Sequence, residues 1–203
     1  MLGKFFRKIE NYVGKRYLRR LPRLAPNIIS FATLIPAAGS IYFIINKLYL
    51  LSALMISLSL LLDVIDGSIA RNQKMMTKFG AYFDPMMDRF AEALIYFGLF
   101  LSGFQLESFL AIVGILLMGT AKSWAFMIIS IGNFDWPAIG DRSERYMVLL
   151  IALGIAHFKA FIFERPVISL ALWIIIVLVY FGTIQRIFFA KSLIEKYGKR
   201  GAK

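Results

Sequence analysis

Four aspartates in the first half of the chain are the residues best suited to chemistry. Asp63 and Asp66 are three residues apart, and Asp84 and Asp88 are four residues apart. On helices, each spacing places the two carboxylates of a pair on one face, and a loop between two such helices allows all four to converge. Carboxylates beside very apolar segments are costly and need compensating positive charge. Oxygen-only ligands select hard cations, so the cluster predicts bound Mg²⁺ or Mn²⁺.

A pair of such ions would suit chemistry at phosphorus. Two ions about 3.5–4 Å apart, held by carboxylates, form the usual clamp for displacement at a phosphate. Between the aspartates, Gly67 and Gly80 lack side chains and would let a nucleotide approach the helix backbones. Arg71 and Lys78 are placed to meet phosphate oxygens. Aspartates that served only as helix caps or ion-pair partners would need neither a shared face nor two glycines, so metal-dependent phosphoryl-type chemistry is the stronger interpretation.

The composition restricts the class of protein and its chemistry. The 203 residues are 59% hydrophobic and 18% charged, with a mean hydropathy of +0.69, which indicates an integral membrane protein. The chain has no cysteine and a single histidine, His157, which excludes disulfides and the usual zinc sites. The net charge is +12, but the basic residues gather beside apolar segments, which favours topology signals and membrane lipids over nucleic acid.

Six apolar segments predict an all-α protein with six transmembrane helices, since each is close to the roughly 20 residues that a helix needs to cross a bilayer. Their approximate ranges are 27–45, 48–70, 80–102, 107–131, 144–163 and 166–190. The connections after the first, third and fifth segments hold few basic residues, whereas the termini and the other connections are rich in them. By the positive-inside rule, both termini and the aspartates face the cytoplasm, and the protein lies in the cell membrane.

Residues 1–24 predict an amphipathic helix on the membrane surface. Apolar residues recur there every three or four positions, with lysines and arginines between them. Pro22 and Pro26 would end this helix, and Asn27 can cap the first membrane helix. The expected organisation is a juxtamembrane helix at 1–24, a six-helix catalytic domain at 25–190 and a basic cytoplasmic tail at 191–203.

The aspartate stretch resembles the signature of the CDP-alcohol phosphotransferase family, with no departure at any fixed position. The matching pattern is Asp63-x2-Asp66-Gly67-x2-Ala70-Arg71-x8-Gly80-x3-Asp84-x3-Asp88. Pro26-Asn27, before the first membrane segment, is similar to the family's Pro-Asn. The resemblance implies an N-terminal surface helix, six membrane helices and a homodimer. It also implies transfer of a phosphatidyl-type group from a CDP-linked lipid to an alcohol, with release of CMP.

The same resemblance implies roles for single residues. The four aspartates would hold two metal ions, and Asp88 would also be the base that takes the acceptor's hydroxyl proton. The residues implied near the cytidine and its pyrophosphate are Gly67, Arg71 and Gly80, with Thr77 and Asn27 as further candidates. A metal-bound carboxylate is a weak base, but the hydroxyl loses its proton only as the new P–O bond forms, so the role is chemically consistent.

The acceptor alcohol must be recognised by other polar residues on the cytoplasmic side. Arg142 and Arg145 before the fifth segment, and Arg186 near the end of the sixth, resemble the arginines of members that use inositol phosphate. Those members have a lysine in the fourth helix where this chain has Ala125, and Lys122, about one turn away, is the candidate replacement. The alternative is that Arg142 and Arg145 are topology signals and that Arg186 reaches out to the membrane interface.

Other features leave the acceptor open. Asp84-Pro85 resembles members that use glycerol phosphate, so inositol phosphate is favoured and glycerol phosphate or another polar alcohol is the alternative. Glu92, one turn beyond Asp88, would either pair with Arg89 or contact the acceptor. The donor's tails, acyl or isoprenoid-ether, are equally open. A non-enzymatic alternative is a small ion-coupled transporter, but transport would spread ionisable groups through the membrane, and these acids lie at one end.

Overall fold

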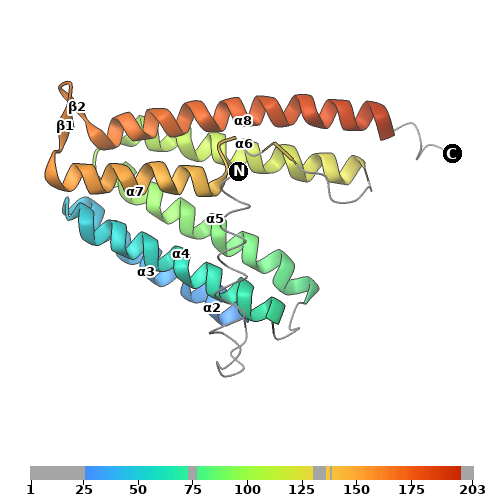
Figure 1. Ribbon diagram of the computed structural model, residues 1–203, viewed down its shortest axis with the longest axis horizontal. Helices are drawn as coiled ribbons and strands as arrows, with labels where there is room; N and C mark the ends of the chain where they lie inside the picture. Colours follow the sequence, from blue (N-terminus) through green and yellow to red (C-terminus); the bar gives the residue numbers. More distant parts are fainter. Residues whose placement is uncertain (1–25, 73–76, 130–135, 138, 198–203) are drawn as a thin grey trace.

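The computed structural model describes residues 26–72, 77–129, 136–137 and 139–197. These residues are mostly helical; the yellow to red helices run along the long axis of the molecule, and the blue to green helices are inclined to it (Figure 1). The predicted surface helix at 1–24 lies outside the described residues, as do residues 198–203 of the predicted tail.

The helices follow the apolar segments expected from the sequence. They are α2 (Pro26–Ala32), α3 (Leu34–Ile45), α4 (Tyr49–Asn72), α5 (Lys78–Leu101), α6 (Gln105–Ile128), α7 (Arg142–Phe158) and α8 (Val167–Tyr197). The first segment is divided between α2 and α3, and α8 continues past residue 190, the expected start of the tail.

Within the described residues, one short hairpin departs from an all-helical chain. It joins α7 to α8 and consists of β1 (Phe161–Ile162) and β2 (Arg165–Pro166), which pair antiparallel. Phe163 and Glu164 at its turn have φ values of 48° and 61°. This left-handed conformation at both positions is what a tight two-residue turn requires, and it allows α8 to run back along the bundle.

The division between α2 and α3 follows from Pro36. Proline has no N–H to donate to the carbonyl four residues earlier, and its ring crowds that carbonyl, which disfavours a continuous helix at this point. Thr33 lies at the break, where its hydroxyl donates to the carbonyl of Ser30 at 2.6 Å. The hydroxyl of Ser59 on α4 donates to the carbonyl of Thr33 at 2.9 Å, so the break is fixed against α4.

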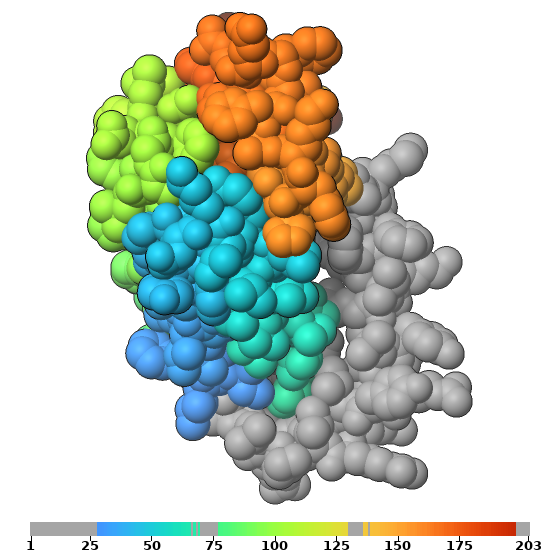
Figure 2. Space-filling model, turned by 90° about the vertical axis from the view of Figure 1, so that its left-hand side faces the viewer, coloured from blue at the N-terminus to red at the C-terminus, as the bar shows by residue number. Residues whose placement is uncertain are grey.

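The helices from α3 to α8 pack as a closed ring of neighbours. α3 packs on α4, α4 on α7, α7 on α8, α8 on α6, α6 on α5, and α5 on α3. Figure 2 views the end that carries the hairpin, where the cyan surface of α4 borders the orange surface of α7 and the hairpin. The buried apolar core lies toward this end and includes Ile56, Ile95, Leu99, Leu153 and Leu172. α4 and α5 make few direct contacts with each other, although both carry the aspartates.

The helices and their surface identify a membrane protein. Among the described residues, three helical stretches are long and apolar enough to cross a membrane: Ile28–Ile45, Gln105–Ile128 and Val167–Tyr197. Large apolar side chains lie exposed at three- and four-residue spacing on α8, at Ile174, Val177, Phe181, Ile184 and Phe188. An exposed apolar stripe of this length suits contact with lipid. Three helices that carry charged residues of the candidate site, α4, α5 and α7, miss this criterion, whereas α8, which carries Arg186, meets it.

Candidate active site

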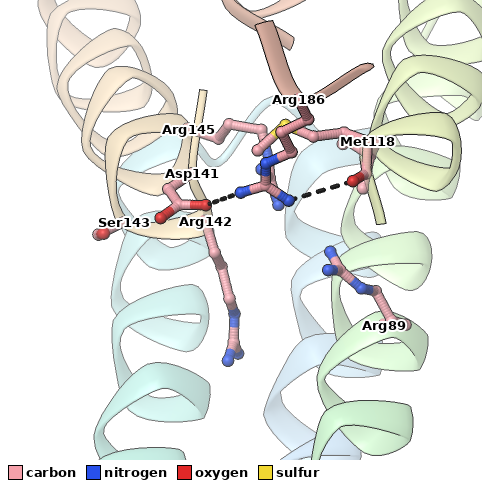
Figure 3. A pocket seen from close by; sticks show the side chains of 8 residues that line it. Arg89, Met118, Asp141, Arg142, Ser143, Arg145 and Arg186 are labelled. Carbon is pink, nitrogen blue, oxygen red and sulfur yellow. Dashed lines mark hydrogen bonds and ion pairs between the residues drawn. The ribbon is translucent and has the colours of Figure 1, made fainter. Parts of the chain in front are cut away.

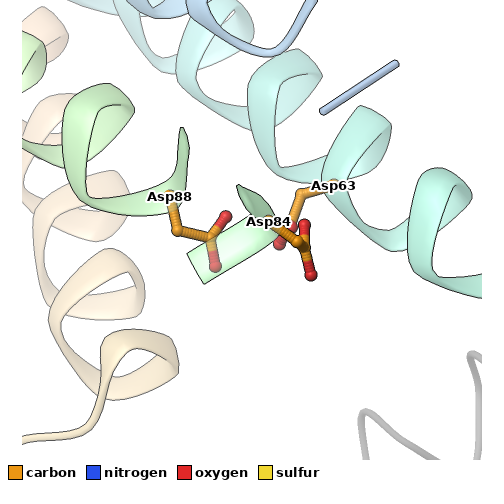
Figure 4. Close-up of side chains that lie close together, drawn as sticks. All are labelled: Asp63, Asp84 and Asp88. Carbon is orange, nitrogen blue, oxygen red and sulfur yellow. The ribbon is translucent and has the colours of Figure 1, made fainter. Parts of the chain in front are cut away.

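Three of the four predicted aspartates meet between α4 and α5 (Figure 4). Asp63 lies on α4, and Asp84 and Asp88 lie one turn apart on α5. One carboxylate oxygen of each lies within 4.8 Å of the others. Asp66 lies on α4 one turn after Asp63, but its side chain is outside the described residues. Three converging carboxylates fit a hard divalent cation such as Mg²⁺ or Mn²⁺.

The start of α5 fixes the position of its two aspartates. Thr77 caps the helix, and its hydroxyl oxygen accepts a hydrogen bond from the N–H of Gly80 at 2.9 Å. Pro85 lies inside α5 without dividing it, and its missing N–H leaves the carbonyl of Ala81 without the usual helical bond. Both aspartates therefore remain on one continuous helix.

Arg142, at the start of α7, reaches the aspartates. Its Nη1 lies 2.9 Å from Oδ2 of Asp63 and forms a second ion pair with Oδ2 of Asp88. Its Nε is buried and has no hydrogen-bond partner among the described residues. The positive charge that the acids need is therefore supplied in part by the chain itself, from a residue expected to bind the acceptor.

Arg142 also lines a polar pocket of about 190 Å³. The charged and polar side chains of this pocket, which we call the arginine pocket, are Arg89, Asp141, Arg142, Ser143, Arg145 and Arg186 (Figure 3). Four guanidinium groups thus face a single carboxylate in the lining. A pocket of this charge fits a doubly negative group such as a phosphate ester.

Arg145 is held firmly in the wall of the arginine pocket. Its Nε and Nη2 donate to the two carboxylate oxygens of Glu92 at 2.8 and 2.9 Å, and its Nη1 donates to the carbonyl of Gly140. The side chains of Arg145 and Glu92 are only 2% and 3% exposed. Glu92 also accepts a bond from Nη1 of Arg89 at 3.2 Å. This buried carboxylate joins α5, which carries two of the aspartates, to α7.

Arg186 enters the arginine pocket from α8. Its Nη2 donates to Oδ1 of Asp141 at 2.7 Å, and its Nη1 donates to the carbonyl of Met118 on α6 at 3.1 Å. Its Nε donates to the carbonyl of Pro137 at 3.3 Å. Arg186 therefore joins α6, α8 and the segment that precedes α7.

The turn that precedes α7 packs directly on the backbone of α8. A side chain on Gly182 would come within 2.2 Å of the carbonyl oxygen of Ile139, and one on Gly140 within 2.6 Å of the carbonyl oxygen of Leu178. Gly140 also has a φ of 75°, which favours glycine. These two close approaches set the position of Asp141 and of the start of α7.

A second pocket, of about 430 Å³, lies between α4 and α7. Asp63, Arg142 and Ser143 are among its lining residues, so it adjoins the aspartate cluster. Its apolar part runs along both helices and is formed by Leu60, Val64, Met147, Leu150 and Ile151. A hydrocarbon chain fits this lining, with its polar head beside Asp63.

Comparison with known proteins assigns this arrangement to a family. Residues 23–194 match the family model described as CDP-alcohol phosphatidyltransferase. The chain belongs to this family. The family predicted from the aspartate pattern is confirmed, and with it the enzyme class. The protein is a CDP-alcohol phosphotransferase of phospholipid biosynthesis that uses Mg²⁺ or Mn²⁺, and the transporter alternative has no support.

Relatives of this phosphatidyltransferase match most of its length. Archaetidylinositol phosphate synthase of Pyrococcus horikoshii is 26% identical over 179 residues, which cover 85% of this chain and 86% of the relative. Phosphatidylinositol phosphate synthase of Mycolicibacterium smegmatis is 28% identical over 188 residues, which cover 89% of this chain and 82% of the relative.

Solved structures show that the fold is shared. The crystal structure of Mycobacterium tuberculosis phosphatidylinositol phosphate synthase in complex with manganese and citrate has a TM-score of 0.70 to this chain, at 20% identity. The alignment covers 90% of this chain and 88% of that chain. A second structure of the M. tuberculosis enzyme, with CDP-DAG bound, also has a TM-score of 0.70, at 21% identity, and covers 90% of this chain and 94% of that chain.

The structure of the phosphatidyltransferase brings most of the predicted acceptor residues together. Arg142, Arg145 and Arg186 all line the arginine pocket. Lys122 is not among its lining residues. Its side chain is exposed on α6, with Nζ 5.8 Å from the ring centre of Phe126. The geometry therefore does not support Lys122 as the replacement for the lysine of other members.

The predicted nucleotide residues of the phosphatidyltransferase are placed only in part. Gly67 and Gly80 are half-buried on α4 and α5, close in sequence to the aspartates. Thr77 serves as the cap of α5. The side chains of Arg71 and Asn27 lie outside the described residues.

Two charged residues of the arginine pocket were not predicted from the sequence. Arg89 directly follows Asp88 and pairs with Glu92 three residues later, and this local spacing is a signal that could have identified it. The pairing of Glu92 with Arg89, one of the two predicted alternatives, is observed. Asp141 pairs with Arg186, which is 45 residues away, so no local pattern indicates its role.

Proposed function

We propose that this enzyme transfers the phosphatidyl-type group of a CDP-linked lipid to inositol phosphate and releases CMP. The observation that carries the proposal is the position of Arg142, which bonds to Asp63 and Asp88 and also lines the arginine pocket. A phosphorylated acceptor in that pocket would lie next to the carboxylates. The names of the relatives from P. horikoshii and M. smegmatis support inositol phosphate as the acceptor.

The donor fits the pocket between α4 and α7. Its apolar lining suits a lipid tail, and its polar end at Asp63 would receive the pyrophosphate. Such a lining recognises hydrocarbon rather than its linkage, so acyl and isoprenoid-ether donors both suit it. The M. tuberculosis enzyme with CDP-DAG bound supports a CDP-linked lipid as the donor.

The aspartates would supply both the metal ligands and the base. Asp63, Asp84 and Asp88 would hold the divalent cations, with Asp66 as the predicted fourth ligand. When bound, such ions polarise phosphate oxygens and offset the charge that develops at phosphorus. Asp88 takes the proton of the acceptor's hydroxyl while that oxygen bonds to the lipid's phosphorus. The bond from this phosphorus to the CMP oxygen breaks at the same time, and CMP leaves.

The arginine pocket would orient the acceptor for this step. Arg142 and Arg186 present guanidinium groups to its phosphate, and Arg145 stiffens the wall through its bonds to Glu92. A fixed phosphate leaves one hydroxyl directed at Asp88, which removes much of the entropic cost of bringing the two reactants together.

The test is a comparison of acceptors with purified protein in detergent. CMP release from CDP-diacylglycerol should be fastest with inositol phosphate, slower with glycerol phosphate, and slowest with serine and free inositol. Faster release with glycerol phosphate or with an unphosphorylated alcohol would overturn the proposed acceptor and leave the reaction class unchanged.

We further propose six membrane crossings, with α2 and α3 together forming the first and with both termini and the site on the cytoplasmic side. The positions of the charged site residues on α4, α5 and α7 support this arrangement, because they lie toward the end of each helix that would face the cytoplasm, and α4, with 24 residues, is about 36 Å long. Since the chain has no cysteine, single-cysteine variants report the side directly. A membrane-impermeant maleimide applied to intact cells should label Ala160→Cys and not Lys203→Cys. The reverse pattern would invert the topology.

The homodimer implied by the family resemblance is also part of the proposal. Light scattering of the detergent-solubilised protein, corrected for bound detergent, should give twice the 23.1 kDa mass of one chain. A mass of one chain at micromolar concentration would contradict it.

A further inference from the structure

The four arginines of the arginine pocket differ in how many of their donors are already used. Arg145 donates through Nε, Nη1 and Nη2, and Arg186 does the same with other partners. Both residues are buried, at 2% and 6% exposure. Their guanidinium groups are thus fixed in the wall of the pocket and have fewer donors left for a ligand.

Arg89 lines the same pocket with most of its donors unused. Its side chain is 42% exposed, and among the described residues its one ion pair is with Glu92, at 3.2 Å. This contact is longer than the bonds that Glu92 accepts from Arg145. Figure 3 shows the guanidinium of Arg89 directed from α5 toward that of Arg186. On the α6 side, Gly119 faces Nη2 of Arg89, and a side chain built there would lie only 3.6 Å from it.

We propose that Arg89 binds the acceptor's phosphate directly and that Glu92 positions it. The inference rests on the proposed function and names a specificity-determining residue of the same site. Because Nη1 of Arg89 bonds to Glu92, its Nε and Nη2 remain for a ligand within the described part of the chain, and this edge of a planar guanidinium can bind a phosphate through two parallel hydrogen bonds. Because Arg89 directly follows Asp88, a phosphate held by Arg89 is anchored to the helix that carries the base.

This arrangement gives a physical reason for selecting phosphorylated alcohols. Arg89 and Asp88 are neighbours on α5, so an acceptor must carry its phosphate and its reacting hydroxyl at a separation that matches these two side chains. An alcohol without a phosphate would not bind to the guanidinium of Arg89. The hydroxyl of such an alcohol would therefore not be held in a fixed position beside Asp88. Selection should therefore appear mainly in the KM for the acceptor.

Glu92 keeps two guanidinium groups of like charge in place. It bonds to Arg145 through both carboxylate oxygens and to Arg89 through one of them. A neutral residue of the same size would leave Arg89 repelled by Arg145 and turned away from the phosphate. Glu92 is thus a positioning residue that acts through Arg89.

The experiment measures the KM for inositol phosphate, the KM for the CDP-lipid and inhibition by inorganic phosphate. Arg89→Gln should raise the first KM about 10- to 100-fold, the loss expected for a charged hydrogen bond, and weaken phosphate inhibition by a similar factor. The KM for the CDP-lipid should stay unchanged. Arg89→Lys, which keeps the charge, should recover part of the loss. Lys191→Gln, which removes an exposed charge from α8, should match the wild type in all three values.

Glu92→Gln should raise the same acceptor KM, and the double variant with Arg89→Gln should lose less than the product of the two single effects. If the double variant raised the acceptor KM by the full product of the two single effects, Glu92 would not act through Arg89. An unchanged acceptor KM in Arg89→Gln would overturn the role of Arg89 while the wild type still used inositol phosphate.

Direct calorimetry with inorganic phosphate separates this inference from the proposed function. If the wild type rejects inositol phosphate, the proposed acceptor fails, but phosphate binding by the wild type and its loss in Arg89→Gln would still support the phosphate site. Equal phosphate affinity in the two proteins would refute it. The Arg89→Lys variant serves the same comparison if the glutamine variant does not fold.

Discussion

The two halves of the site hold their charges in different ways. In the aspartate cluster, three carboxylates converge, and Arg142 is the cation that contacts Asp63 and Asp88. In the arginine pocket, the buried guanidinium groups have carboxylate partners: Glu92 for Arg145, and Asp141 for Arg186. Carboxylates that lie close together repel each other and need a bound cation to offset their charge. Side chains in ion pairs hold each other in position without a ligand. The arginine pocket thus keeps its shape without a ligand, whereas the aspartate cluster would be completed by the metal ions proposed for it.

This difference predicts different consequences of mutation. Changes in the aspartate cluster should abolish turnover and leave the fold intact, because carboxylates that repel each other contribute little to stability. Changes among the paired residues of the arginine pocket should alter stability and acceptor affinity together.

The largest effect is expected from Asp88→Asn. The substitution keeps the shape of the side chain and removes both the base and a metal ligand. The rate of CMP release should therefore fall by about 10²- to 10⁴-fold from the loss of the base, and further from the loss of the ligand. Thermal unfolding in detergent should show an unchanged melting temperature. Near-normal turnover would remove Asp88 from the mechanism.

Arg145→Ala should lower the free energy of unfolding by about 3–5 kcal/mol, because Glu92 would be left buried without its main partner. Chemical unfolding in detergent measures the loss. The double variant Arg145→Met with Glu92→Leu should recover most of the stability but not the affinity for inositol phosphate. A double variant as unstable as the single one would show that packing, rather than the unpaired charge, causes the loss.

Gly182→Ala should disturb the pocket through the backbone. The added methyl group would meet the carbonyl oxygen of Ile139 and push the turn before α7 away from α8, at a cost of about 1–3 kcal/mol. The KM for the acceptor should rise several-fold, as kinetic assays can show. The control is Gly154→Ala on α7, where a side chain meets nothing within 4 Å and the KM should not change. Similar changes in both variants would argue against the close approach.

The smallest effect concerns the residue shared by the two halves. Arg142→Gln removes the positive charge that contacts Asp63 and Asp88, so a divalent cation meets less repulsion there. Calorimetry without substrates should show Mg²⁺ binding that is a few-fold tighter than in the wild type. Weaker Mg²⁺ binding would mean that Arg142 supports the metal site rather than competing with it.

The aspartates could be predicted because their spacing is local. Asp84 and Asp88 share a face on any helix, and the two glycines and Arg71 have fixed places in the same stretch. Most ends of the apolar segments were also close to the observed helix ends, since long apolar runs mark membrane helices strongly. The exceptions are α7, which ends at Phe158 rather than 163 because the hairpin follows it, and α8, which continues to Tyr197 rather than ending at 190. The break at Thr33 was missed, although Pro36 is the physical cause.

The arginine pocket could be predicted only in part, because its contacts join distant residues. Arg145 and Glu92 are 53 residues apart, and no periodicity connects α5 with α7. Sequence alone therefore identified Arg142, Arg145 and Arg186 as one group but not their counter-charges. Lys122 was assigned from its position along α6, and its side chain lies exposed outside the pocket lining.

The most direct test of the account is the mass of the lipid product. The purified protein, with CDP-diacylglycerol, inositol phosphate and Mg²⁺, should form a lipid that carries both the donor's phosphate and the acceptor's phosphate, together with one CMP per lipid. EDTA should abolish the product, and added Mg²⁺ or Mn²⁺ should restore it. A lipid with a single phosphate, or a product that forms in EDTA, would contradict metal-dependent transfer to a phosphorylated alcohol.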